Sequence, residues 1–167
     1  MERPKFIPQL KNADKALNIA AFIALAMLWA MTTAAYGHLP DVIPTHFNFR
    51  GEADAFGSPG SIFTGAAIGS ALFLLMTILL RYPYKMNYNV TITAENAAFH
   101  YATASRMIRY LRFSIMLLFI GIEYVTIYTA RNPEFEIGGW FIAIIMVMIH
   151  FPVFFFLIKM SSHGESK

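Results

Sequence analysis

The sequence predicts an all-α integral membrane protein with four transmembrane helices, and three observations support this prediction. Of the 167 residues, 57% are hydrophobic and only 14% are charged, whereas soluble domains average about 25% charged residues. The apolar residues gather in four runs, and each run has the length of about 20 residues that a helix needs to cross a bilayer. One long polar stretch separates the first run from the second. A soluble fold of this size has too little interior to hide so much apolar surface.

We expect a single membrane domain that covers the whole chain, 1–167, with four spans and one long loop. The first apolar run is interpreted as an anchor because the core of a cleaved signal peptide holds only about 7–15 residues. The sequence Thr33-Ala34-Ala35 keeps a signal peptide as the alternative. The spans are expected at about 16–36, 61–80, 111–130 and 140–158, and the loop at 37–60.

Small residues recur at four-residue spacing on the second span, at Ser61, Gly65 and Gly69. Such a face allows another helix to approach closely. Packing against a neighbouring span of the same chain is the favoured interpretation, and dimerisation is the alternative.

The third span is expected to belong to a long helix that begins outside the bilayer on the side of the termini. Residues 87–93 alternate in polarity and predict a short extended segment before this helix. Thr93 is a suitable N-cap, and Glu95 falls in the first turn, where the helix dipole favours a negative charge. The helical pattern then runs from Ala94 into the apolar run without a break.

Three arginines, Arg106, Arg109 and Arg112, follow one another at three-residue spacing where this helix enters the bilayer. Residues spaced in this way occupy neighbouring positions on one helix face. We expect their side chains to reach the lipid headgroups, as long basic side chains do near the ends of membrane helices. A dedicated site for a regulatory lipid is the alternative.

The distribution of basic residues predicts the orientation. All Lys and Arg residues except Arg50 and Arg131 fall on the side that holds both termini. Because basic segments stay on the cytoplasmic side, we expect a multi-pass protein of the bacterial inner membrane with both termini in the cytoplasm. The loop at 37–60 then faces the outside. The acidic residues on that side are Asp41, Glu52, Asp54, Glu134 and Glu136.

Glu123 and His150 stand out as polar residues inside apolar spans. A charged group at the bilayer centre costs roughly 2.5–3.5 kcal/mol on insertion scales, so such residues usually face protein or water. The third and fourth spans are neighbours in an up-down bundle, so these two side chains are expected near mid-membrane, about one helical turn apart in depth. A structural hydrogen bond between them is the favoured interpretation. A proton-accepting site and a ligand pocket are the alternatives.

The loop at 37–60 holds the side chains that are best suited to bind a ligand. Its prolines and glycines predict turns and extended pieces. Imidazole and carboxylate groups suit zinc and similar ions, but no recognised ligand spacing is present, so metal binding stays open. Side-chain-to-backbone hydrogen bonds that order the loop explain the same residues. The candidates for ligand binding or loop ordering are His46, Asn48, Gly51, Glu52 and Asp54.

Several classes of activity lack their sequence signals. The chain has no cysteine, which excludes a disulfide and a thiol nucleophile. Phosphate-binding, zinc-protease and serine-hydrolase motifs are absent. We therefore expect a protein that is not an enzyme, uses no cofactor and binds no nucleic acid.

The stretch LPDVIPTHFNFRGEADAFGS resembles the signature of a bacterial membrane domain of unknown function, number sixteen-forty-eight, that also begins the longer SdpI-like immunity proteins. The sequence departs from that signature at Ala55, where glycine is usual, and at Pro59, where lysine is usual. The sequence thus lacks the lysine on which a charge-dependent role at that end would depend. The resemblance covers the first two spans and their loop. The matching positions are Leu39, Pro40, Ile43, Pro44, His46, Phe47, Asn48, Gly51, Asp54, Phe56, Gly57 and Ser58.

The resemblance implies a short stand-alone member of the SdpI-like family that binds or senses an extracytoplasmic ligand, with toxin or peptide immunity or signalling as its role. An acidic outer loop suits a cationic peptide. The expected partners are membrane lipids, a peptide toxin or small ligand at the outer loop, and further copies of the chain. The alternative is a proton-coupled transporter, or a component of one, that uses Glu123 and His150.

Overall fold

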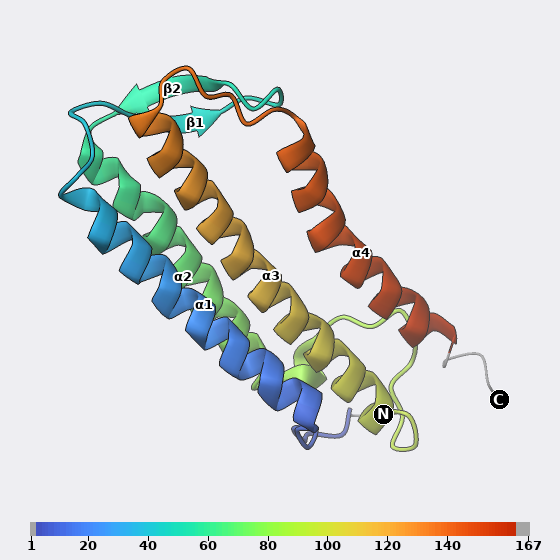
Figure 1. Cartoon of the computed structure of the whole chain (residues 1–167). Helices are drawn as coiled ribbons and strands as arrows, with labels where there is room; N and C mark the ends of the chain where they lie inside the picture. Colours follow the sequence, from blue (N-terminus) through green and yellow to red (C-terminus); the bar gives the residue numbers. More distant parts are fainter. Residues whose placement is uncertain (1–2, 163–167) are drawn as a thin grey trace.

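The computed structural model describes residues 3–162 and consists mostly of four long helices (Figure 1). They are α1 (Asn12–Tyr36), α2 (Ile62–Leu79), α3 (Ala97–Arg131) and α4 (Trp140–Ser162). Each is long and apolar enough to cross a membrane, as the sequence predicted. They run alternately up and down, so the start of α1 and the end of α4 lie at one end of the bundle, which we call the termini end.

The loop between α1 and α2 forms a β-hairpin at the opposite end of the bundle, which we call the hairpin end (Figure 1). Strand β1 (Ile43–Phe47) pairs antiparallel with β2 (Ala53–Gly57), with a register irregularity around His46. The sequence predicted extended pieces here but not their pairing, which satisfies the backbone groups of an extended chain. The fold is therefore mostly helical and not all-α.

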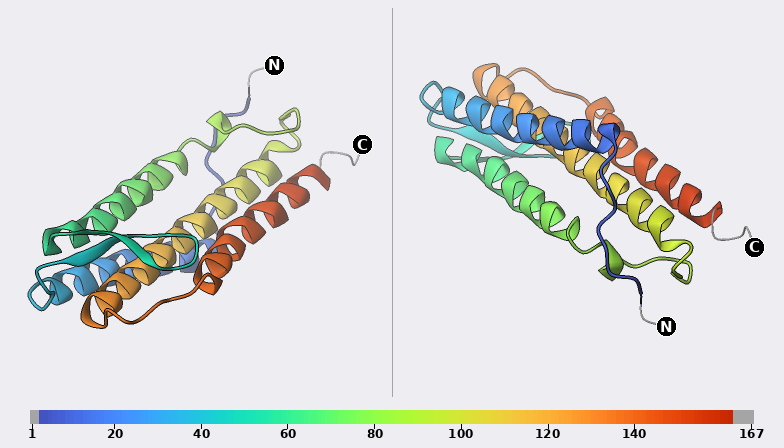
Figure 2. Two further views of the ribbon diagram at one scale, coloured as in Figure 1. Left: turned by 90° about the horizontal axis from the view of Figure 1, so that it is seen from above. Right: turned by 90° about the horizontal axis from the view of Figure 1, so that it is seen from below.

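Helix α3 is the centre of the bundle and packs against α1, α2 and α4 (Figure 2). Its 35 residues extend over about 52 Å, well beyond the roughly 30 Å of a hydrocarbon core. Helix α4 packs mainly on α3 and buries only Phe156 among its residues. A helix that is apolar on all sides is expected to face lipid, so α4 has the surface of a membrane span.

The small residues of α2 pack inside the chain. A Cβ atom at Gly69 would lie 3.3 Å from Leu28 of α1 and 3.3 Å from Phe119 of α3. At Gly65 it would lie 3.3 Å from the Oε2 atom of Glu123 in α3. The small-residue face therefore lets α2 approach α1 and α3 closely, which confirms the interpretation of internal packing.

The start of α3 differs from the prediction. Residues 87–93 form no strand, and the helix begins at Ala97, three residues after the expected start at Ala94. Residues 94–96 form a turn, and the side-chain oxygen of Asn96 accepts a hydrogen bond from the backbone N–H of Thr93 at 2.9 Å. Asn96 thus takes the N-cap position expected for Thr93, and its side chain orders the turn before the helix without capping the first helical turn.

The segment before α1 lies on the connection between α2 and α3. Arg3 donates a hydrogen bond to the carbonyl of Met86 at 2.8 Å, and the Tyr101 hydroxyl donates to the carbonyl of Pro4 at 3.0 Å. The guanidinium of Arg3 also lies 5.6 Å from the ring centre of Tyr88. Burial raises the pKa of the Tyr88 hydroxyl above its ordinary value. These contacts fix the termini end of the bundle.

The three arginines of α3 turn into the bundle, which corrects the expectation that their side chains reach the lipid headgroups. Arg109 and Arg112 are 6% and 2% exposed, and Arg106 is partly buried. The reason is that α1 and α2 offer polar groups at the same depth. Arg112 donates hydrogen bonds to Thr77 of α2 at 2.8 Å and to Asn18 of α1 at 2.6 Å. Binding of a lipid headgroup by these residues stays a prediction.

Arg106 and Asp14 form the ion pair that joins α3 to the start of α1. Two guanidinium nitrogens of Arg106 donate to the two carboxylate oxygens of Asp14, at 2.8 and 3.0 Å. The backbone N–H of Lys11 also donates to this carboxylate at 2.9 Å, which ties the helix start to the same group. Asp14 is 4% exposed, so little solvent screens the pair.

Asp14→Asn is expected to lower the free energy of unfolding by about 1–3 kcal/mol, because it leaves the Arg106 guanidinium without its charged partner. Thermal unfolding of the purified protein in a mild detergent measures the effect. Lys15→Gln, at an exposed neighbouring position, is the matched control and should leave the melting temperature unchanged. Equal melting temperatures for wild type and Asp14→Asn would contradict the structural role of the pair.

Candidate functional site

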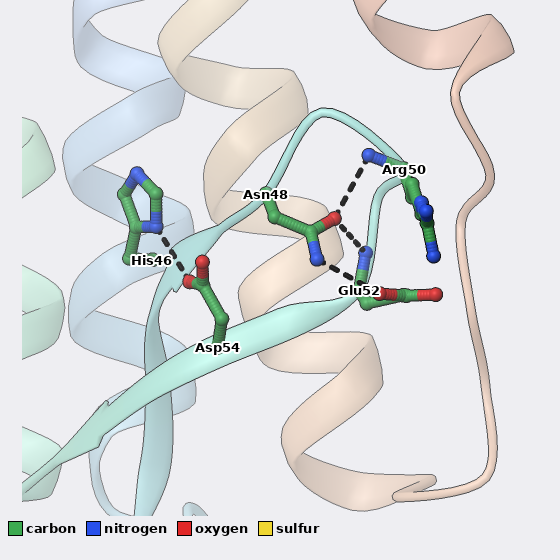
Figure 3. A network of polar contacts seen from close by, with 5 residues as sticks. All are labelled: His46, Asn48, Arg50, Glu52 and Asp54. Atoms are coloured by element: carbon green, nitrogen blue, oxygen red, sulfur yellow. Dashed lines mark hydrogen bonds and ion pairs between the residues drawn. The ribbon is translucent and has the colours of Figure 1, made fainter.

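The turn of the hairpin is ordered by Asn48 (Figure 3). Its side-chain oxygen accepts hydrogen bonds from the backbone N–H groups of Arg50 at 2.8 Å and Glu52 at 3.2 Å. Its side-chain nitrogen donates to the Glu52 carboxylate at 2.8 Å. The backbone N–H of Gly51 closes the turn on the Asn48 carbonyl at 2.9 Å. Asn48, Gly51 and Glu52 therefore act together as turn-forming residues, in agreement with the loop-ordering interpretation.

Gly51 fixes the hairpin against the connection between α3 and α4. Its φ of +84° lies in the left-handed region that favours glycine. A Cβ atom there would lie 2.7 Å from the side chain of Ile137 and 2.8 Å from the backbone of Gly138. On the same contact surface, a Cβ at Gly139 would lie 3.3 Å from the carbonyl oxygen of Phe49. The turn and residues 137–139 are thus in direct contact.

His46 and Asp54 face each other across the two strands (Figure 3). The Nδ1 atom of His46 lies 2.6 Å from a carboxylate oxygen of Asp54. The two side chains are 67% and 44% exposed, so a ligand from outside can reach both. Within residues 3–162 no three His, Asp or Glu side chains are grouped closely enough to hold a metal ion. The hairpin residues therefore form two polar pairs, His46 with Asp54 and Asn48 with Glu52.

A cavity of about 310 Å³ lies under the hairpin, between α3 and α4. The hairpin contributes Thr45, His46, Phe47 and Gly51 to its wall. The helices and their connection contribute Ile122, Val125, Thr126, Ile137, Phe141, Ile142 and Ile145. The hairpin thus forms the roof of a mostly apolar cavity, and His46 is one of the residues that line it.

A second cavity of about 240 Å³ lies on the other side of the same hairpin strand, between α2 and α3. Both cavities are lined by Thr45, Ile122 and Thr126. The two cavities therefore lie side by side along one face of α3. The first is bounded on its far side by α4, and the second by α2. We call this pair of cavities the hairpin groove.

Glu123 lines the second cavity and has a partner that the sequence analysis missed. Its side chain is 3% exposed, and its Oε1 atom accepts a hydrogen bond from the Thr32 hydroxyl of α1 at 2.5 Å. Thr32 and Thr33 interrupt the apolar run of the first span, which was the one sequence signal for such a partner. Thr126 and Thr45, which line the groove, were also not singled out.

The structure does not bring Glu123 and His150 together. His150 is exposed on α4, and its Nδ1 atom lies 2.8 Å from the carbonyl of Met146 in the preceding turn. The physical reason is that the imidazole satisfies its polar group on its own helix, while Glu123 turns to α1 on the opposite side of α3. The expected hydrogen bond between the third and fourth spans is therefore absent from residues 3–162.

Comparison with known proteins finds a family profile to which the hairpin region is similar. Residues 22–69 match the profile of a family described as a domain of unknown function, DUF1648. The match covers the hairpin and the parts of α1 and α2 on either side of it. It is also 28% identical to an uncharacterized protein of Archaeoglobus fulgidus over 172 aligned positions, which cover 95% of this chain and 94% of that protein. No solved structure matches the chain.

The DUF1648 match covers the roof of the groove and one of its walls. It begins within α1, runs through the whole hairpin and ends within α2, at residue 69. Thr45, His46 and Gly65 lie inside this range. The floor of the groove, built by α3, and the wall built by α4 lie outside it.

Gly51→Ala is expected to detach the hairpin turn from residues 137–139, because both its φ and the close contacts exclude a Cβ atom. We expect a loss of stability of about 1–3 kcal/mol and faster proteolysis at the hairpin. Gly37→Ala is the matched control, since Gly37 has a φ of −70° and nothing within 4 Å of an added Cβ. Limited proteolysis and thermal unfolding provide the measurement, and identical behaviour of both variants would argue against this contact.

Proposed function

We propose that this protein is a membrane-bound binding protein, not an enzyme, that takes up a cationic peptide at the hairpin groove and serves immunity or signalling. One observation carries the proposal: the DUF1648 hairpin roofs a mostly apolar cavity of about 310 Å³, with His46 among its lining residues. Ligand pockets are typically concave, lined by apolar side chains and equipped with a few polar groups. The groove has each of these properties.

The charge at the hairpin end supports a cationic ligand. Opposite charges around a binding site speed encounter and disfavour partners of the wrong sign. Asp54 is exposed beside the cavity, and Glu52 lies at the turn. Further exposed carboxylates lie in the neighbouring connections, at Asp41, Glu134 and Glu136.

The geometry does not support the alternative function, proton-coupled transport. That hypothesis needed Glu123 and His150 to act together, and they face different surroundings on different helices. Oligomerisation, which transport through so small a bundle would require, stays a prediction. Binding at the groove is therefore the function that the geometry favours.

The proposal requires the hairpin end to face the outside of the bacterial inner membrane and both termini to lie in the cytoplasm, as the distribution of basic residues predicts. The absence of cysteine from the chain makes this testable by labelling. A membrane-impermeant maleimide should label Glu134→Cys in intact spheroplasts and Lys85→Cys only after lysis. Both positions are exposed. The reverse pattern would exclude an extracytoplasmic groove.

His46→Ala and Asp54→Ala are expected to abolish protection of host cells against a membrane-active cationic peptide that the wild type resists. The measurement is growth in a panel of such peptides at matched expression. Lys15→Ala, exposed at the termini end, is the control and should protect as the wild type does. Full protection by both hairpin variants, or no protection by the wild type against any peptide, would contradict the proposed function.

A further inference from the structure

We propose that the second cavity of the hairpin groove binds an aliphatic ammonium group of the ligand, with Glu123 as its counter-ion. The inference rests on the proposed function and adds the chemistry by which the ligand is recognised. It is carried by the position of one buried carboxylate in a cavity that also presents hydroxyl groups.

One carboxylate oxygen of Glu123, Oε2, is available to bind a ligand. Thr32 donates to Oε1, and within residues 3–162 no side chain or backbone group donates a hydrogen bond to Oε2. The Oε2 atom lies beside Gly65, where the missing side chain leaves the cavity open to it. A Cβ atom at Gly65 would approach Oε2 to 3.3 Å, so glycine there preserves access to the carboxylate.

No basic side chain is paired with Glu123 among the described residues, although a carboxylate in the interior of a membrane protein normally has a partner. The ion pairs within residues 3–162 lie elsewhere, at Asp54 in the hairpin and at Asp14 near the termini end. Charge balance at Glu123 therefore requires either a bound proton or a cation supplied from outside the chain.

The rest of the cavity wall suits an ammonium ion in particular. An alkylammonium carries three N–H donors and no acceptor, so it is satisfied by a carboxylate together with neutral oxygen atoms. The hydroxyls of Thr45, Thr64 and Thr126 line the same cavity as Glu123. Ile62, Ile68 and Ile122 also line it and provide an apolar surface for an aliphatic stem. This combination resembles the environment that a lysine side chain requires, with its charge bound and its stem buried.

The groove is also open toward the surface of the bundle where a ligand can enter. Thr64, Ile68 and Ile122 are exposed along it, between α2 and α3. The cavity reaches Pro44 and Thr45 of the hairpin at its upper end. A peptide bound at the hairpin can thus insert a lysine into the groove without crossing the packed interface between α1 and α3.

The test uses the full-length protein in phosphatidylcholine nanodiscs, with octylammonium as the probe and octanol as its uncharged counterpart. We expect octylammonium, but not octanol, to raise the melting temperature in a saturable manner. Glu123→Gln keeps the size of the side chain and a hydrogen bond with Thr32, and it should weaken the apparent affinity about ten- to hundredfold. Glu95→Gln removes the same charge at an exposed site outside the groove and should bind as the wild type does.

Two further variants keep the test decisive if Glu123→Gln fails to fold. Gly65→Ala retains the carboxylate but covers it, and Thr126→Val removes one hydroxyl at constant volume, so both should weaken octylammonium binding. Equal responses to octylammonium and octanol, or an unchanged affinity in Glu123→Gln, would overturn the ammonium site even if the protein protects cells. Charge-selective binding that depends on Glu123, together with a failed protection assay, would support the site and reject the immunity role.

Discussion

The interaction on which the rest of the structure depends is the polar contact between α1 and α3. In a bilayer, polar side chains find partners within the protein because lipid tails offer none. Asp14 and Asn18 near the start of α1 meet Arg106 and Arg112 of α3. Thr32 near the other end of α1 meets Glu123 in the same way. These contacts fix the register of two helices whose apolar surfaces alone would permit sliding.

Helix α4 takes no part in this interface and is held differently from the other helices. Helices α1, α2 and α3 are joined by polar pairs and by the close approach at Gly69, whereas α4 packs mainly on α3 through apolar side chains. Its position at the hairpin end depends on the contact between Gly51 and residues 137–139. The hairpin turn and α3 therefore both contact the segment that positions α4 at this end of the groove.

The four spans and the internal packing of α2 could be predicted from sequence because hydrophobic length and small-residue spacing act locally. The direction of the arginine side chains could not, since it depends on Asn18 and Thr77 of other helices lying at the same depth. For the same reason the sequence favours a partner for Glu123 on the span that follows α3, whereas its partner is Thr32 of α1. The hairpin residues were predictable as a turn, but the cavity beneath them arises only from the contact of distant segments.

The groove is built partly by residues that match the DUF1648 profile and partly by residues outside that match. Residues 22–69 supply the hairpin roof and Gly65, so the DUF1648 match carries the scaffold that opens the groove. Glu123 and the apolar floor come from α3, beyond that match. A protein with the same roof and a neutral residue at the position of Glu123 would present a groove of the same shape without a counter-ion. Under the proposed function, α3 therefore determines which ligand charge the groove accepts, and the hairpin forms its entrance.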